Sequence, residues 1–461
     1  MKPRYCLLLF LVMLPACRKH APFDWPRPLP LGRDLPSYVP PPGHEATPDV
    51  DAGPAFDEPA TLSLRDAMAA ALLSNPELRT FAWEVRATEA RALQAGLPPN
   101  PEAGVELENV GGNGGVRVLN GSETTLSISQ LLLVGGKLEK RIRLASLDRD
   151  LSAFDYETAR VDVLTMVATR FVRLLAAQKR VELAAQAHDL ATGVFEVVSK
   201  RVQAGDLSPV ERTRSRVNVS TARLALEQAR RTRRAGRIRL ASLWGNTRPT
   251  FETAEGDLDR VPATIPSADA LAELVSNNPD VARWAVEMSK RRAALAEARA
   301  DAVPDVTVQG GVRHFNDGDD TAFVVGLTLP LPLFDRNQGR RLEARTNIHK
   351  THEAHRAALT RVRTALGDGY EMLGSSHAAV TTLRDEILPD ANSAIEATRK
   401  AFQEGKLGHL DILDAQRTLV QLEAEYLDAL TTFHVSVAAV ERLIAQPLED
   451  VSSSAPQGAR P

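Results

Sequence analysis

The hydrophobic positions of this chain follow two different periods, and the shorter one predicts β-strands. Apolar and polar residues alternate over about 102–110 and 122–132, and again over about 305–315 and 321–331. Each pair of segments encloses a turn rich in Gly, Asn or Asp, which is typical of a β-hairpin. One face of these strands is apolar and the other carries Ser, Thr, Gln and Glu, as in the strands of membrane barrels. Four strands cannot close a barrel, and lipid does not tolerate open edges, so we expect other subunits to complete it.

The longer period predicts long α-helices in the rest of the chain. Residues 137–204 contain no proline and a single glycine, Gly193, and at 1.5 Å per residue they would extend over about 100 Å. Pro389 should start or kink a helix at the same level of the second half. The other expected helices are bounded by cap residues, prolines and glycines. The first helix of each copy spans about 62–96 or 267–300; Ser63 or Ser267 opens it, and it ends before Pro98 or Pro304. The return helices span about 208–245, after Gly205, and 408–446, after Gly405.

The two halves of the chain are copies of one unit. Asn75-Pro76 recurs as Asn278-Pro279, and Gly205 recurs as Gly405, with similar residues around each. Matches at a nearly constant offset of about 200 residues indicate a tandem duplication. We therefore expect two repeats, at about 61–260 and 261–447.

Both ends of the chain are expected to lie outside this duplicated fold. Residues 1–16 have a basic start and a short apolar core, which is typical of a secretory signal peptide. Residues 14–17 resemble the lipobox of bacterial lipoproteins, so we expect lipidation of Cys17; ordinary signal cleavage is the alternative. The proline-rich segment 17–60 predicts an extended tether, and 448–461 is expected to be a disordered tail.

The composition excludes several classes of protein. The chain has 56 basic and 59 acidic residues, so it lacks the excess of basic residues that a nucleic-acid-binding protein shows. Its two cysteines are Cys6 and Cys17, which excludes zinc fingers, redox pairs and disulfide scaffolds. No phosphate-binding loop, Ser-His-Asp order or His-Glu-x-x-His motif occurs, so we expect neither an enzyme nor a cofactor. No run reaches the ~18–20 apolar residues of a transmembrane helix.

One motif carries a family resemblance. Residues 402–416 read Phe-Gln-Glu-Gly-Lys-Leu-Gly-His-Leu-Asp-Ile-Leu-Asp-Ala-Gln, an aromatic-x-x-Gly turn followed by Asp-x-Leu-Asp-Ala. Together with the duplicated layout, this motif resembles the TolC-type outer-membrane efflux factors. Asn75-Pro76-Glu77-Leu78 and the segments 95–102 and 129–137 are similar to the heavy-metal, CzcC-type branch of that family. The resemblance covers about 62–447.

The resemblance implies a mainly α fold with a membrane β part. It implies a homotrimer, with a twelve-stranded β-barrel in the lipid of the outer membrane and a twelve-helix α-barrel in the periplasm. A periplasmic adaptor and an inner-membrane pump of the resistance-nodulation-division (RND) class would be its partners. The expected function is a passive exit duct for cations, above all divalent heavy metals. The alternatives are a duct for drugs or organic solutes and a periplasmic coiled-coil scaffold without a pore.

The same resemblance assigns functional residues to the tip where the long helices turn. Asp411 and Asp414 are three residues apart and share one helix face, and in a trimer they would form rings of carboxylates that select cations at a periplasmic gate. The first copy would add Glu211, with a polar contact from Arg212 or Arg214. The other expected gate and adaptor-contact residues are Phe402, which replaces the tyrosine that often gates family members, and Gly205, Leu207, Gly405 and Leu407 at the turns.

Three further clusters are expected to be parts of the surface. A metal ladder of three histidines is the alternative for His349, His352 and His355, but their spacing spreads them over more than one face of a helix. The acidic turn with Asp317, Asp319 and Asp320 lacks the bidentate Glu of a calcium loop and is expected to be an external loop. The basic residues after each second strand would lie near anionic headgroups or start solvated helices; they are Lys137, Lys140, Arg141, Arg143, Arg336, Arg340, Arg341 and Arg345.

Overall fold

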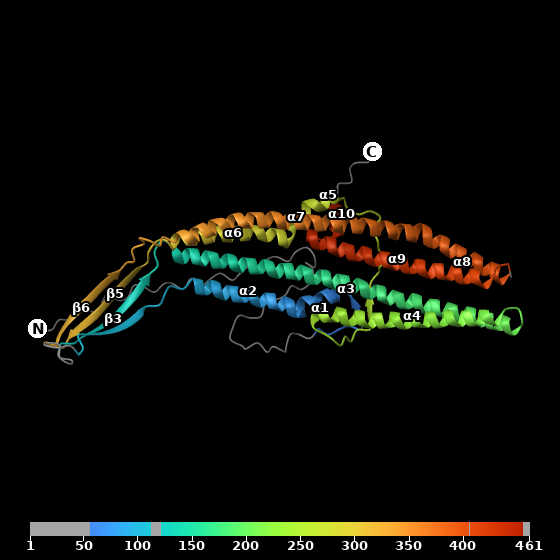
Figure 1. Ribbon diagram of the computed structural model, residues 1–461, viewed down its shortest axis with the longest axis horizontal. Helices are drawn as coiled ribbons and strands as arrows, with labels where there is room; N and C mark the ends of the chain where they lie inside the picture. Colours follow the sequence, from blue (N-terminus) through green and yellow to red (C-terminus); the bar gives the residue numbers. More distant parts are fainter. Residues whose placement is uncertain (1–55, 112–120, 405, 455–461) are drawn as a thin grey trace.

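The computed structural model describes residues 56–111, 121–404 and 406–454. The residues expected to form the signal peptide, the lipidation site Cys17 and most of the tether lie outside this part of the chain. So do Gly405 and most of the turn expected between the first two strands. The described chain is elongated, with a sheet at one end and long helices that run to the other end (Figure 1).

The sheet joins the two copies. β2 (Glu102–Glu108) and β3 (Glu123–Leu132) form one hairpin, and β5 (Val306–Phe315) and β6 (Asp320–Thr328) form the other. All neighbouring strands are antiparallel, in the order β2-β3-β5-β6. Each segment with a period of two in the sequence therefore contains a strand. β2 and β6 are the edges, and neither pairs with a further strand of the described residues.

The first helix of each copy is interrupted, whereas the sequence predicted a single helix over 62–96 and another over 267–300. In copy one the two pieces are α1 (Leu64–Ser74) and α2 (Pro76–Ala95). In copy two the pieces are α5 (Ala268–Glu273), the 3₁₀ turn η3 (Leu274–Asn277) and α6 (Pro279–Ala300). The prediction of continuous helices is therefore wrong in both copies.

The interruption follows from the Asn-Pro pair that both copies share. Asn75 has φ −65° and ψ 120°, because a following proline disfavours the α conformation. Its side chain accepts a hydrogen bond from the Leu78 N–H at 2.8 Å and donates one to the Leu243 carbonyl at 2.7 Å. Asn278 repeats this arrangement in copy two and donates to the Leu443 carbonyl at 3.0 Å. Each break thus attaches the first helix of a copy to the end of its last helix.

The long helices of copy one form an antiparallel pair. α3 (Lys137–Gln203) is a single helix of 67 residues, which is about 100 Å long, as the absence of proline predicted. α4 (Pro209–Ala241) returns along it and ends in a 3₁₀ turn, η2 (Ser242–Trp244). No helix in the described ranges is long and apolar enough to cross a bilayer.

The corresponding helices of copy two are interrupted once. α7 (Gln338–Thr382) passes through a π-helical turn, η4 (Leu383–Ile387), into α8 (Leu388–Gln403). α9 (His409–Ile444) returns along them. Pro389 lies in the first turn of α8, where its missing N–H costs little, and the π turn precedes it. The proline thus coincides with the irregular turn between α7 and α8, at the place where the sequence predicted a helix start or a kink.

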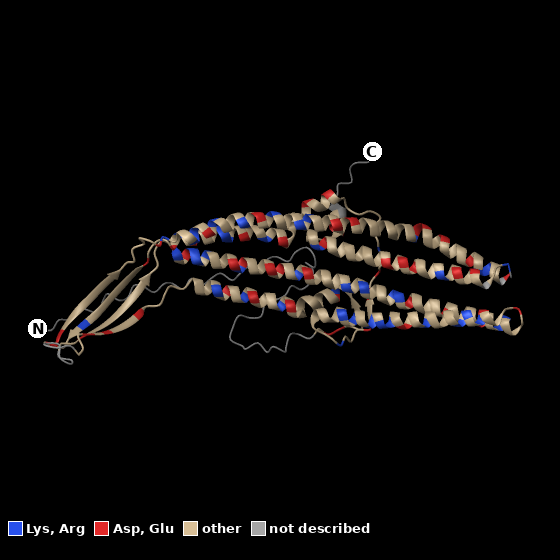
Figure 2. Ribbon diagram, in the orientation of Figure 1, with Lys and Arg blue, Asp and Glu red and all other residues tan. Residues whose placement is uncertain are grey.

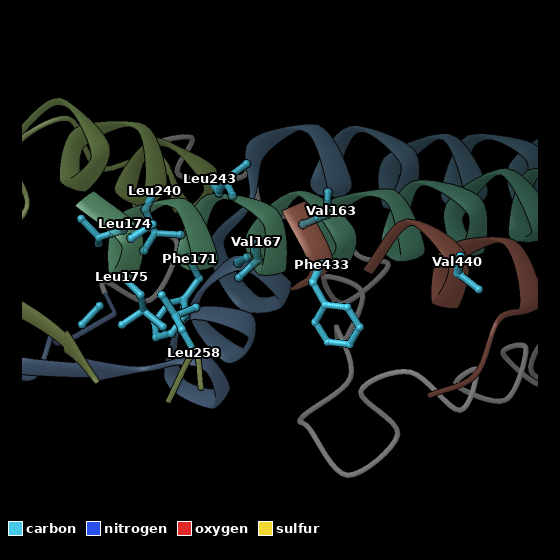
Figure 3. Close-up of a cluster of buried hydrophobic side chains, with 14 of the residues drawn as sticks. Val163, Val167, Phe171, Leu174, Leu175, Leu240, Leu243, Leu258, Phe433 and Val440 are labelled. Atoms are coloured by element: carbon cyan, nitrogen blue, oxygen red, sulfur yellow. The ribbon is translucent and has the colours of Figure 1, made fainter. Parts of the chain in front are cut away.

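One hydrophobic core connects the two copies near the middle of the helices. β1 (Thr61–Ser63) pairs in parallel with β4 (Thr253–Glu255), which belongs to the segment between the copies. Gln178 pairs with the backbone of Ala254 through two hydrogen bonds of 2.8 Å, as a neighbouring strand would. Buried side chains of α3, α4, α9 and the linking segment meet here (Figure 3); they include Val163, Val167, Phe171, Leu174, Leu175, Leu240, Leu243, Leu258, Phe433 and Val440.

The C-terminal segment is held by packing against this core. α10 (Leu448–Ser454) buries Leu448 and Val451, and the Leu448 N–H donates to a carboxylate oxygen of Glu441 at 2.9 Å. The disordered tail predicted for 448–461 is therefore wrong over the length of α10, because two apolar residues one turn apart are buried there. The residues after α10 lie outside the described chain.

Candidate functional site at the helix tips

The functional residues predicted from the sequence lie where the long helices turn, at the end far from the sheet (Figure 1). Gly205 follows α3 with φ at 86°, a left-handed conformation that glycine adopts without strain. The Asp206 N–H donates to the Arg201 carbonyl at 2.9 Å and closes the turn. Leu207 is half-buried, and Leu407 is 40% exposed at the turn of copy two. The turns of both copies therefore lie at the same end of the molecule.

A cleft of about 650 Å³ lies between the first turns of α4 and those of α9, and we call it the tip cleft. Its charged residues are Arg214 on α4 and Asp411, Asp414 and Arg417 on α9. The structure thus brings the two predicted aspartates together with two arginines, one from each copy. The rest of the lining consists of Thr213, Val217, Asn218, Leu410 and Leu413.

The two aspartates of the tip cleft have different surroundings. The Gly408 N–H donates to Asp411 Oδ2 at 2.7 Å, so this carboxylate caps the first turn of α9 and is stabilised by the positive end of the helix dipole. Asp414 lies about one turn further and is exposed, and its carboxylate has no ion-pair or hydrogen-bond partner in the described part of the chain. Asp414 is therefore the aspartate whose charge is fully available to a cation in the cleft.

Glu211 does not line the tip cleft, although the sequence placed it beside the aspartates. Arg214 Nη1 lies 3.0 Å from Glu211 Oε1, about one turn along α4, so this carboxylate is neutralised within copy one. Arg214 itself faces the cleft, and Arg417 does so from α9. The sequence analysis missed Arg417, although it follows Asp414 by three residues and so shares its helix face. The site therefore combines acidic and basic groups.

Phe402 connects the two copies close to the tip. The Cζ atom of Arg201 lies 5.7 Å from the centre of the Phe402 ring, which is a cation–π contact between α3 and α8. Phenylalanine lacks the hydroxyl of the tyrosine that the family resemblance implies for this position, so it donates no hydrogen bond. Its contribution here is the contact with the guanidinium.

The histidines of α7 lie on its surface or against another ring. His349 and His352 are exposed, and the ring centre of His355 lies 6.0 Å from that of Trp284 in a stacked arrangement. Among the described residues, no group of three or more His, Cys, Asp or Glu side chains is arranged to hold a metal ion.

In the acidic turn between β5 and β6, His314 Nε2 lies 3.7 Å from a carboxylate oxygen of Asp319.

Lys137 does not face a membrane surface, which corrects the prediction of a basic cluster that begins with this residue. Its side chain is buried, and Nζ lies 2.8 Å from Asp305 Oδ1, where α3 begins and β5 is about to start. The Val134 N–H donates to the same carboxylate at 3.0 Å. Partial burial alone would raise the pKa of Asp305, but the hydrogen bonds from Lys137 and Val134 and the lysine charge bring the pKa below its ordinary value. The pair joins the sheet to the helices.

These features define a class of protein: a duplicated, mainly helical chain with a four-stranded sheet at one end and charged helix turns at the other. The family described as outer membrane efflux protein matches residues 67–246 and 270–446, one match in each copy. The chain therefore belongs to the outer membrane efflux protein family, which confirms the TolC-type resemblance of its motifs. Members of this family are outer-membrane efflux channels and not enzymes.

Relatives with known functions include metal-resistance proteins. The chain is 33% identical over 401 residues to the cobalt-zinc-cadmium resistance protein CzcC of Cupriavidus metallidurans. The aligned region covers 85% of this chain and 93% of that protein. It is 27% identical over 265 residues to the nickel-cobalt-cadmium resistance protein NccC of Alcaligenes xylosoxydans xylosoxydans, covering 57% of this chain and 59% of that protein.

Solved structures of outer-membrane channels share the fold. Crystal structures of CusC match with a TM-score of 0.69 at 16% identity, covering 89% of this chain and 99% of that chain. The open state of the Neisseria gonorrhoeae MtrE channel matches with a TM-score of 0.69 at 20% identity, covering 90% of this chain and 98% of that chain. The mainly helical fold is therefore one that this chain shares with outer-membrane channels.

Proposed function

We propose that three copies of this chain form the outer-membrane exit duct of a tripartite RND efflux system, and that the duct exports divalent metal cations. The single observation that carries the proposal is the 33% identity to a cobalt-zinc-cadmium resistance protein over 85% of the chain. A periplasmic adaptor and an inner-membrane RND pump then deliver the cations from the periplasm or cytoplasm, and the duct itself is passive. Lipidation of Cys17 gives the assembly a further attachment to the membrane.

The sheet supports the membrane part of this proposal. Val105, Leu126, Val312 and Phe323 are partners across the four strands and form one apolar face, on which Phe323 is 85% exposed and Val105 74%. Insertion into lipid removes such surface from water, but lipid does not tolerate the unpaired edges of β2 and β6. Three four-stranded sheets joined edge to edge give a barrel of twelve strands without a free edge, and twelve helices continue it into the periplasm.

The tip cleft supports a gate at the opposite end. In a trimer, Asp411 and Asp414 recur three times around one axis, and such rings of carboxylates attract cations. Arg214 lines the same cleft from α4, so movement of α9 towards α4 brings its guanidinium closer to the two aspartates and favours closure. The adaptor opens the gate when it separates the two helices. Glu211 and Phe402 are proposed to belong to the same gate, and the residues proposed to contact the adaptor at the helix turns are Gly205, Leu207, Gly405 and Leu407.

The test is single-channel conductance of the purified protein in planar bilayers. The wild type is expected to show a small, cation-selective conductance that Co²⁺ or Zn²⁺ blocks from the periplasmic side. Asp414→Asn removes one negative charge from each tip cleft, so the blocking concentration should rise about tenfold, which corresponds to ~1.4 kcal/mol.

The matched control is Glu425→Gln, which removes the same charge from an exposed position of α9 outside the cleft lining. This variant should be blocked at the wild-type concentration. Folded trimers without any conductance, in the wild type and in Asp414→Asn alike, would contradict the duct. Equal block of Asp414→Asn and wild type would contradict the gate and leave the duct in place.

A duct for organic solutes is the second candidate. The chain is 25% identical over 386 residues to the pyoverdine export outer membrane protein OpmQ of Pseudomonas aeruginosa. Under this alternative, loss of the chain sensitises cells to organic compounds and leaves metal tolerance unchanged. Ion conduction by purified trimers would be evidence against the third alternative, a scaffold without a pore.

A further inference from the structure

α4 and α9 are the equivalent return helices of the two copies, but their charges are opposite. α4 has ten arginines, two glutamates and no lysine. α9 has six acidic residues and two arginines. Figure 2 shows the basic residues distributed along α4 and the acidic ones along α9. The duplicated helices therefore present different surfaces at equivalent places.

Five exposed arginines of α4 lie in a row, which we call the arginine stripe: Arg212, Arg216, Arg223, Arg230 and Arg234. Their spacings of four and seven residues return each side chain to nearly the same angle around the helix. The stripe extends over about 33 Å at 1.5 Å per residue. Arg214, which lines the tip cleft, lies on the opposite side of α4, so the stripe faces away from the proposed gate.

The chain's own residues neutralise little of the arginine stripe. Arg230 pairs with Glu227 at 2.8 Å, and the Cζ atom of Arg216 lies 5.9 Å from the centre of the Phe195 ring. The other three arginines have no carboxylate within ion-pair distance in the part of the chain that the structure describes. Like charges along one helix face repel one another, and the planar guanidinium group suits contact with carboxylates. The stripe is therefore suited to an acidic partner surface.

The duplication indicates where that partner lies. The two copies are offset by about 200 residues, so each arginine of the stripe has an equivalent position on α9. These positions hold Ile412, Gln416, Glu423, Leu430 and His434. Three of them are buried, namely Ile412, Gln416 and Leu430. α9 packs against α3 as well as against α7 and α8, and Arg180 of α3 pairs with Asp428 of α9. Within the described residues, α4 has α3 as its one long helical neighbour. By the symmetry of the duplication, the missing neighbour is the α7–α8 flank of another molecule.

The η4–α8 part of this flank is acidic and exposed. Glu386 and Asp390 are four residues apart on one helix face, and neither has an ion-pair partner among the described residues. Asp390 lies 13 residues before the end of α8 and Arg223 lies 14 residues after the start of α4, so both are about 20 Å from the tip. Glu386 and Arg230 both lie further from the tip, at similar distances along their helices. α4 and the α7–α8 flank lie on opposite sides of the molecule (Figure 1).

We propose that the arginine stripe of one molecule binds the Glu386–Asp390 face of the next, with Arg223 opposite Asp390 and Arg230 opposite Glu386. This inference rests on the proposed trimer and specifies its helical seam, in which basic α4 meets acidic α8 at each subunit boundary. A contact between two different surfaces closes into a ring when its rotation allows. The rotation that relates one molecule to the next also brings the edge strand β2 of one molecule beside the edge strand β6 of its neighbour. Contact between two α4 helices is disfavoured, because their arginines repel.

Charge reversal in the full chain tests the seam. The measurement is the fraction of trimer in detergent, determined by size-exclusion chromatography with light scattering. Arg223→Glu/Arg230→Glu places like charges across each boundary, so the dissociated fraction should rise about tenfold or more. Glu386→Arg/Asp390→Arg should have the same effect from the other side.

The decisive variant combines all four substitutions. It restores opposite charges across the boundary with reversed polarity, and the trimer should recover. A matched control is Arg361→Glu/Arg363→Glu, which makes the same change of charge at exposed positions of α7 that lie 23 residues or more before Glu386 and so outside the level of the proposed contact. This control should leave the trimer intact.

Two failures are distinguishable. A monomeric wild type would contradict the proposed duct, whereas a trimer that is indifferent to Arg223→Glu/Arg230→Glu, or a combined variant that does not recover, would overturn the seam alone. Where charge variants do not fold, Arg223→Cys with Asp390→Cys keeps the proposal testable. A short bismaleimide should join neighbouring molecules of this double variant and should join neither single variant. Cross-linking of the stripe to the adaptor instead would also overturn the seam.

Discussion

Arg442 Nε donates a hydrogen bond to Asp162 Oδ1 at 2.8 Å, which joins α9 of copy two to α3 of copy one. The Nη1 atom of the same guanidinium donates to Asp280 Oδ2 at 2.7 Å. At intervals of seven residues along α3, two further ion pairs with α6 continue this line; they are Asp155 with Arg283 and Asp148 with Lys290. The two copies are therefore held in register by a ladder of opposite charges.

Arg442→Met should destabilise the protein, because it leaves two partly buried carboxylates without their common partner. We expect a loss of about 2 kcal/mol in the free energy of unfolding, measured by thermal melting of the helical circular dichroism signal. Arg180→Met is the control, because its pair with Asp428 is exposed and should contribute less than about 1 kcal/mol. Equal losses in the two variants would argue against a special role for Arg442.

Glu441 should make stability depend on pH. Burial raises its pKa to about 7; the Leu448 N–H opposes this rise, and the charges of Glu449 and Asp450 add to it. The folded pKa of Glu441 lies above the ordinary ~4.3 of glutamate, so folding favours the protonated carboxyl. The stabilisation that this preference provides is fully present below about pH 4, and it is lost as the pH rises through about 7.

Glu441→Gln should therefore stabilise the protein at pH 8 by about 1–3 kcal/mol and change little at pH 4. Thermal melting at both pH values checks this expectation. Glu425→Gln, an exposed carboxylate on the same helix, should show no such pH dependence. A Glu441→Gln effect of the same size at both pH values would show that the carboxyl does not titrate as described.

Glu58 attaches the residues before β1 to the loop after α4. Its carboxylate accepts hydrogen bonds from Trp244 Nε1 at 2.8 Å, from Asn246 Nδ2 at 2.7 Å and from the Thr250 N–H at 2.6 Å. Partial burial would raise the pKa of Glu58, but these hydrogen bonds, led by that of Trp244, outweigh it and lower the pKa. The stabilisation is therefore present above about pH 4 and is lost as the pH falls through the lowered pKa.

Glu58→Ala should reduce stability by about 1–2 kcal/mol and should shift the fluorescence emission of Trp244 towards longer wavelengths. Asp57→Ala, an exposed neighbour, is the control and should change neither quantity. Unchanged Trp244 emission in Glu58→Ala would mean that this hydrogen bond does not order the loop.

The buried pair of Lys137 and Asp305 should show strong coupling. Asp305→Asn leaves a buried ammonium group without its counter-charge, so we expect a loss of about 3 kcal/mol. Lys137→Met/Asp305→Asn removes both charges and should recover part of this loss. A double-mutant cycle of melting temperatures measures the coupling. Additive effects of the two substitutions would contradict a direct interaction.

The parts of the fold that depend on local patterns could be predicted from the sequence. The strands follow from a period of two, the length of α3 from the absence of proline, and the turn at Gly205 from a glycine at a helix end. Asn75-Pro76 and Asn278-Pro279 carried the signal for a helix break as well. They served as evidence of the duplication, and each of the two helices was predicted to be continuous.

The parts that depend on tertiary contacts could not be predicted in this way. Lys137 belongs to a run of basic residues in the sequence, and only the position of Asp305, far away along the chain, explains why it is buried. Leu448 and Val451 lie in a polar tail, and their burial depends on a core built from both copies. In the tip cleft, Asp411 and Asp414 were predicted from a motif, whereas the position of Arg214 opposite them depends on how α4 and α9 pack.

The measurement that tests the proposed metal-exporting duct most directly is the metal tolerance of a host strain that lacks this chain and retains its pump and adaptor. We predict reduced tolerance of divalent cations such as Co²⁺ and Zn²⁺, unchanged tolerance of organic compounds, and full recovery when the chain is supplied again. Unchanged metal tolerance together with new sensitivity to organic compounds would contradict the account.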